Sequence, residues 1–109
     1  LIKEIVSMKI IAVTACPSGV AHTYMAAEAL KKACAKAGVK CSVETQGSIG
    51  IEDALSEADI AQATAVVLTT DMPIKGAERF EKLPKIRLTA GQVIKSSDAI
   101  VAKVQKELG

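Results

Sequence analysis

One short segment combines a thiol, a histidine and two hydroxyl side chains just ahead of a predicted helix. It reads Cys16-Pro17-Ser18-Gly19-Val20-Ala21-His22-Thr23. The first N–H groups of a helix have no partner within it and the helix dipole is positive there, so an anion binds without a cationic side chain. The same field favours the thiolate, which is both the better nucleophile and the better leaving group. The segment therefore predicts that Cys16 is itself phosphorylated, with phosphate-binding groups from Pro17, Ser18, Gly19, Val20, Ala21, His22 and Thr23.

Three of these side chains also have purely structural interpretations. A free cysteine is often a small buried residue, but packing poorly explains why Cys16 is followed by Pro, Gly and a helix start. We therefore favour the functional interpretation of Cys16. His22 either donates to the phosphoryl group or only shapes the loop. Thr23 caps the helix, binds phosphate, or does both.

Asp71 and Arg79 are candidates for the edge of the site. Asp71 follows a predicted buried strand, and its favoured interpretation is a turn residue ahead of Met72 and Pro73. Arg79 would reach the phosphate or an acidic partner surface, and its favoured interpretation is a solvated charge on a helix.

Cys34 and Cys41 are interpreted as core residues, because each coincides with or adjoins an apolar position of its element. The three cysteines have no metal-type spacing and the chain has one histidine, so no metal site is predicted. No cofactor is predicted either.

The elements that must position this segment alternate between short apolar runs and helical patterns. A nearly continuously apolar strand, buried on both faces, is predicted at 9–15, and a strand with Lys40, Ser42 and Glu44 on a partly exposed face at 39–45. A turn follows at 46–50. Further strands are predicted at 65–69 and 86–88, and helices at 23–37, 52–63, 77–81 and 92–108.

Strands that alternate with helices indicate right-handed βαβ crossovers. The expected fold is an α/β three-layer sandwich, with a four-stranded parallel sheet in the order 2-1-3-4 and helices on both faces. Ligands bind such sheets at the carboxyl ends of the strands, where the strand order reverses. This is where the segment after the first strand must lie.

Composition limits the possible function classes. The chain has 109 residues, of which 50% are hydrophobic and 24% charged, which fits one compact domain and excludes general disorder. No apolar run is long enough to span a bilayer and no secretory signal is visible. A net charge of +2 without clustered basic and aromatic residues argues against nucleic acid as a partner.

An odd number of cysteines without an export signal suggests a reducing, cytoplasmic setting. Residues 1–7 are interpreted as a linker or a tag remnant, and 8–109 as the domain.

The segment from Cys16 to Leu30 closely resembles Cys-Pro-Thr-Gly-Ile-Ala-His-Thr-Phe-Met-Ala-Ala-Glu-Ala-Leu, found in fructose-type IIB components of the bacterial phosphoenolpyruvate-dependent sugar phosphotransferase system. Further matches lie at 44–50, 59–63, 68–71 and 78–82, so the resemblance covers 8–108. The loop at 70–75 departs from the common family pattern.

This resemblance implies a phosphocarrier. The phosphohistidine of a IIA component would donate its phosphoryl group to Cys16, which would pass it to a sugar held by a membrane IIC component. The implied activity is that of a protein-phosphocysteine-sugar phosphotransferase. The domain would be cytoplasmic and would meet the membrane only through IIC, without inserting into it.

Two other classes of protein share part of this pattern. Low-molecular-weight tyrosine phosphatases and arsenate reductases place Cys, five residues, Arg and then Ser or Thr in a similar loop, whereas here His22 and Thr23 follow Cys16 at that spacing. Their Asp-Pro general-acid segment is also missing, because Met72 follows Asp71. A purely structural flavodoxin-like module would leave the Cys16 segment unexplained, and the aromatic planes of a flavin site are lacking.

Overall fold

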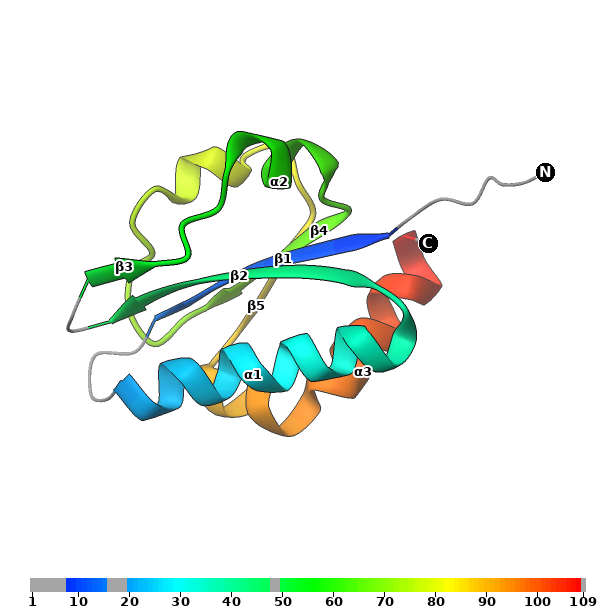
Figure 1. The fold of residues 1–109 in the computed structure, drawn as a ribbon, viewed down its shortest axis with the longest axis horizontal. Helices are drawn as coiled ribbons and strands as arrows, with labels where there is room; N and C mark the ends of the chain where they lie inside the picture. The colour runs from blue at the N-terminus through cyan, green and yellow to red at the C-terminus, as the bar shows by residue number, and fades with distance from the viewer. Residues whose placement is uncertain (1–7, 16–19, 48–49, 109) are drawn as a thin grey trace.

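In a computed structural model the chain forms a mixed sheet covered by helices on both faces (Figure 1). The structure describes residues 8–15, 20–47 and 50–108. The strands are β1 (Lys9–Ala15), β2 (Lys40–Gly47), β3 (Gly50–Glu52), β4 (Ala65–Thr69) and β5 (Lys85–Leu88). The helices are α1 (Val20–Ala37), α2 (Glu57–Gln62), the 3₁₀ helix η1 (Ala77–Phe80) and α3 (Ala90–Leu108).

The strand order is β3-β2-β1-β4-β5. β1 pairs in parallel with β2 and β4, and β4 pairs in parallel with β5. β3 pairs antiparallel with the last residues of β2. The three-layer α/β fold was predicted, but the four-stranded, wholly parallel sheet was wrong, because the sheet is mixed and has five strands.

The extra strand lies where the turn and the start of the second helix were expected. Gly47 pairs with Gly50, which has φ of 108°, a value that few other residues adopt. Asp53 then has φ of 52° and prevents a helix from starting at residue 52. α2 begins only after Ser56, where the side chains and main-chain N–H groups of Ser56 and Asp59 form a capping box.

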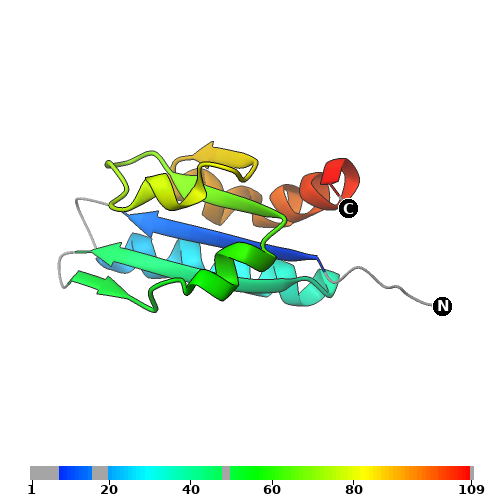
Figure 2. The ribbon, with the colours of Figure 1, turned by 90° about the horizontal axis from the view of Figure 1, so that it is seen from above.

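Two apolar layers hold the sheet between its helices. α1 and α3 cover one face, and α2 with η1 covers the other, as Figure 2 shows from above. On β1, Ile10 and Ala12 face α1 and α3, while Ile11 and Val13 pack with Phe80 on the opposite face. The prediction that the first strand is central and buried on both faces is therefore confirmed.

Candidate functional site

The Cys16 segment connects the carboxyl end of the central strand to the N-terminus of α1. β1 ends at Ala15 and α1 begins at Val20 (Figure 1). Cys16, Pro17, Ser18 and Gly19 lie outside the described residues, and for Val20 and Ala21 only the helical main chain is described. The strand order reverses beside β1, so the chain crosses here the position at which α/β sheets bind ligands.

The helix begins earlier than predicted, and this changes the setting of two candidate residues. His22 and Thr23 lie inside the first turn of α1 rather than ahead of it. Thr23 therefore does not occupy the predicted N-cap position. His22 is exposed to solvent, whereas Thr23 is buried and its carbonyl accepts a hydrogen bond of 3.1 Å from the Thr14 hydroxyl of β1.

Thr69 holds the main chain at the residue immediately before Cys16. The N–H of Ala15 donates to the Thr69 hydroxyl at 2.8 Å, and this hydroxyl donates to the Ala15 carbonyl at 3.1 Å. Both groups lie at the end of β1, beyond Val13 and Leu68, the last pair between β1 and β4, so the Thr69 side chain takes the place of a main-chain partner. The sequence indicated only that residue 69 ends a strand, so this contribution to the site was missed.

Three buried threonines lie side by side on the face of the sheet that α1 covers. Thr14 of β1 pairs in register with Thr45 of β2, and Thr69 is at the end of β4. The Thr45 hydroxyl is buried without a hydrogen-bond partner in the part of the chain that the structure describes. The carboxyl end of the sheet thus offers α1 a polar rather than an apolar surface.

Asp71 caps α3. Its carboxylate accepts a hydrogen bond of 2.7 Å from the N–H of Ala90, the first residue of that helix. Thr89 and Gln92 complete the cap by exchanging side-chain and main-chain hydrogen bonds. The loop after β4 is therefore fixed to α3, a role that the predicted turn did not include.

Arg79 is neither a solvated charge nor a residue free to reach a phosphate. Its terminal nitrogens donate to the two carboxylate oxygens of Glu44 at 2.9 and 3.1 Å, and its Nε donates to the Gly76 carbonyl at 2.6 Å. Glu44 is fully buried, so its predicted place on a partly exposed face was wrong. Alternation along a strand identifies a polar face. It does not tell whether the polar side chains on that face are exposed to solvent or buried and hydrogen-bonded within the protein.

The environment of Glu44 keeps it ionised. Burial alone would raise the pKa of Glu44, but hydrogen bonds from Arg79, Gln46 and the Leu55 N–H outweigh it and lower the pKa. The same ion pair raises the pKa of Arg79. Three residues therefore support one buried charge with four hydrogen bonds.

Gln46 extends this network to the loop after β4. Its amide donates to the Lys75 carbonyl and accepts from the Lys75 N–H, each at 2.9 Å. Together with Asp71 at the other end, this fixes residues 71–75 beside the carboxyl ends of β1 and β4. A cavity of about 410 Å³ opens there, lined among others by Thr69, Met72, Ile74 and Arg87.

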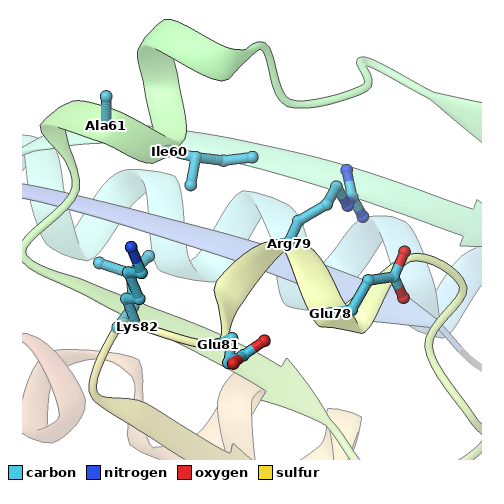
Figure 3. Close-up of a pocket in the computed structure, with 7 residues that line it drawn as sticks. Ile60, Ala61, Glu78, Arg79, Glu81 and Lys82 are labelled. Atoms are coloured by element: carbon cyan, nitrogen blue, oxygen red, sulfur yellow. The ribbon is translucent and has the colours of Figure 1, made fainter.

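A second cavity lies away from this edge. Figure 3 shows it between α2 and η1, lined by Ile60, Glu78, Arg79, Glu81 and Lys82, with a volume of about 390 Å³. Its charged side chains belong to η1 and the residues that follow it. It shares none of its lining with the threonines or with the first turn of α1.

Within the described ranges, no group of three or more His, Cys, Asp or Glu side chains is arranged to hold a metal ion. None of the described helices combines the length and apolar character needed to cross a bilayer.

Comparisons with known proteins agree with this geometry. Residues 11–105 match the family described as "PTS system, Lactose/Cellobiose specific IIB subunit". The chain is 53% identical over 100 residues to the fructose-like EIIB component 2 of Escherichia coli K12, covering 92% of this chain and 94% of the relative.

Solved structures of related proteins have the same fold. The Enzyme IIB subunit of the phosphotransferase system from Escherichia coli K12 superposes with a TM-score of 0.86 at 39% identity, covering 92% of this chain and 93% of the other. A domain of the fructose-specific IIABC component of Borrelia burgdorferi reaches a TM-score of 0.85 at 42% identity, covering 92% and 95%. These matches extend over nearly the whole chain and confirm the resemblance seen in the sequence, so this chain belongs to the IIB family of the phosphotransferase system.

Proposed function

We propose that Cys16 carries the phosphoryl group in this IIB component. In the first step the Cys16 thiolate attacks the phosphorus of a IIA phosphohistidine, the P–N bond breaks, and the imidazole nitrogen takes up a proton. In the second step a sugar hydroxyl held by a IIC component attacks the same phosphorus. The S–P bond then breaks, the thiolate is regenerated and the hydroxyl proton passes to solvent.

The observation that carries this proposal is the chain path from Ala15 to Val20. The residues between them join a fully buried central strand to a helix of 18 residues, at the switch point of the sheet. Phosphoryl transfer depends on positioning and on stabilising the charge of the phosphoryl oxygens. The first N–H groups of α1 would provide the second of these, with Val20, Ala21, His22 and Thr23 contributing their main chain.

Thr69 and Thr14 support the positioning. Thr69 fixes both polar groups of Ala15, and Thr14 fixes the first turn of α1 to β1. The two ends of the Cys16 segment are therefore each anchored to the sheet. Such anchoring lowers the cost of holding the thiolate in line with an incoming phosphoryl group.

We propose a fructose-type sugar as the final acceptor. This assignment rests on the relative and on the Borrelia domain, which are described as fructose-like and fructose-specific. The domain, residues 8–109, would work in the cytoplasm and approach the membrane through IIC.

The position of Arg79 argues against the phosphatase alternative. The cysteine phosphatases need an arginine that binds the phosphoryl oxygens bidentately. The chain has two arginines, Arg79 and Arg87, and Arg79 already binds Glu44 with both terminal nitrogens.

The proposal is tested by transfer to sugar. Membrane vesicles that contain a fructose-type IIC should form labelled sugar phosphate from phosphoenolpyruvate when the general phosphotransferase proteins, IIA and this chain are added. Cys16→Ser should abolish product, whereas the Cys34→Ser/Cys41→Ser variant should retain it. Sugar phosphate formed by folded Cys16→Ser, or rapid hydrolysis of an aryl phosphate by the native chain, would contradict the assignment.

A further inference from the structure

Two cysteines from different elements meet where α1 packs on β2. Cys34 of α1 is fully buried, and Cys41 of β2 packs against the same apolar cluster but is partly exposed. Each thiol lies close enough to the other to shift the other's pKa. We propose that Cys34 and Cys41 form an oxidisable dithiol, which closes to an intramolecular disulfide on exposure to hydrogen peroxide.

The connection between α1 and β2 fixes the two residues relative to each other. The Cys34 carbonyl accepts a hydrogen bond of 2.8 Å from the N–H of Val39, two positions before Cys41. Gly38 allows this tight reversal, because its φ of 73° is readily adopted only by glycine. A disulfide requires its two Cβ atoms to lie close together, and two cysteines that pack in one cluster on either side of this tight reversal meet this condition with little movement.

An oxidant can reach one thiol of the pair. β3 pairs only with Thr45, Gln46 and Gly47, so among the described residues the earlier part of β2 has no strand on that side. An open cavity of about 450 Å³ lies there, lined by Cys41 together with Lys31, Asp53 and Asp59. Cys34 has no exposed surface, so Cys41 is the thiol that a small molecule meets first.

The charges around the pair also favour Cys41 as the thiol that reacts first. The hydrogen bond from Cys34, followed by the ammonium groups of Lys31 and Lys9, lowers the pKa of Cys41 despite its burial. The hydrogen bond with Cys41, followed by burial, raises the pKa of Cys34. Cys41 is therefore the attacking thiolate and Cys34 the resolving thiol.

Hydrogen peroxide would oxidise the pair in two steps. The Cys41 thiolate attacks one oxygen of hydrogen peroxide, the O–O bond breaks, and the released hydroxide takes up the thiol proton to leave as water. The Cys34 sulfur then attacks the Cys41 sulfenic acid, forms the S–S bond and expels a second water. Two thiols and one peroxide give one disulfide and two waters, without Cys16.

The test uses the Cys16→Ser variant, in which Cys34 and Cys41 are the remaining thiols. Folded protein, checked by circular dichroism, is treated with hydrogen peroxide and its intact mass is measured. The expected product is a monomer that has lost two hydrogens and has no free thiol. Trypsin cuts at Lys36 and Lys40, between the two cysteines, so their peptides should stay joined until a reductant is added.

Matched variants separate a dithiol from two inert core residues. With Cys34→Ala added, Cys41 should gain oxygen instead of forming the disulfide. With Cys41→Ala added, Cys34 should remain a free thiol under the same treatment, and its reaction should be slower by at least about tenfold. Oxygen uptake at Cys41 while Cys34 stays free, a disulfide between molecules, or no reaction in the Cys16→Ser variant would overturn the proposal. If that variant fails to fold, the same peptide map is made from the native chain.

Discussion

Arg79 binds both carboxylate oxygens of Glu44, at 2.9 and 3.1 Å, and Glu44 is completely buried. This pair joins the end of β2 to η1, while Leu55 donates its N–H to the same carboxylate. An ion pair that is buried and further hydrogen-bonded depends on both partners, since removing one leaves a charge in an apolar interior. The pair thus makes the loop around residues 75–79 part of the folded core.

Arg79→Met should be strongly destabilising. We expect a loss of about 3 to 5 kcal/mol in the free energy of unfolding, because Glu44 is left as an unpaired buried charge. Urea denaturation followed by circular dichroism measures this loss. Lys82 is exposed and lines, with Arg79, the cavity between α2 and η1. Lys82→Met is therefore the control and should alter the free energy of unfolding by at most about 0.5 kcal/mol.

A double variant isolates the role of the charge. Glu44→Gln combined with Arg79→Met removes both charges and should recover part of the stability lost by Arg79→Met alone. Equal effects of Arg79→Met and Lys82→Met would show that the pair contributes no more than an exposed lysine.

Acid stability should depend on Asp59. The hydrogen bond from Lys9, at 2.6 Å, followed by those from Ser56, lowers the pKa of Asp59 from 3.8 to about 2. Because the folded-state pKa is depressed, the stabilisation is present above pH 3.8 and is lost as the pH falls from 3.8 toward 2. The lowered pKa of Glu44 acts in the same direction below 4.5.

Asp59→Asn removes the titrating group, so its free energy of unfolding should fall less steeply in that pH window than that of the native chain. Chemical denaturation at a series of pH values gives both slopes. Asp98→Asn is the control, since the Lys36–Asp98 pair at 3.3 Å is exposed. Parallel slopes for the native and Asp59→Asn chains would refute the expected linkage.

Thr69→Val should impair the site while keeping its shape. The hydroxyl that serves both polar groups of Ala15 is lost, at a cost of about 1 to 3 kcal/mol in stability. Looser anchoring beside Cys16 should also slow the initial rate of phosphorylation several-fold under conditions in which the variant is fully folded. Thr70→Val, an exposed change one residue later, should leave that rate unchanged, and similar rates for the two variants would argue against positioning by Thr69.

Thr45→Val should not destabilise the protein, in contrast to Thr69→Val. The Thr45 hydroxyl is buried and has no partner among the described residues, so an apolar group of the same shape avoids an uncompensated desolvation cost. We expect stability to stay equal or to rise by about 1 kcal/mol, measured as the urea midpoint at constant slope. A clear loss of stability would mean that this hydroxyl is satisfied in solution.

The sequence predicted the parts of the fold that local pattern determines. A short, nearly continuous apolar run rich in β-branched residues is typical of a strand buried on both faces, as β1 is, and β4 has the predicted bounds. β3 could not be predicted, because a three-residue strand carries no periodicity and depends on pairing with Thr45, Gln46 and Gly47. The late start of α2 depends on the backbone of Asp53 and on the capping box at Ser56.

The candidate site likewise could be predicted only where local sequence determines it. A thiol between a strand and a helix can be recognised from sequence, since the chemistry lies in adjacent residues. Thr69 is 54 residues from Ala15 along the chain, and Arg79 is 35 residues from Glu44, so their contacts follow only from the strand order. The side chains that anchor the segment and the adjacent loop were therefore missed or misassigned.

Phosphorylation of Cys16 is tested most directly by intact-protein mass spectrometry after incubation with phosphoenolpyruvate, the two general phosphotransferase proteins and a fructose-type IIA. The native chain and the Cys34→Ser/Cys41→Ser variant should each gain one phosphoryl group, while folded Cys16→Ser should gain none. Phosphorylation of Cys16→Ser, or its loss in the folded double variant, would place the phosphoryl group elsewhere and contradict the account.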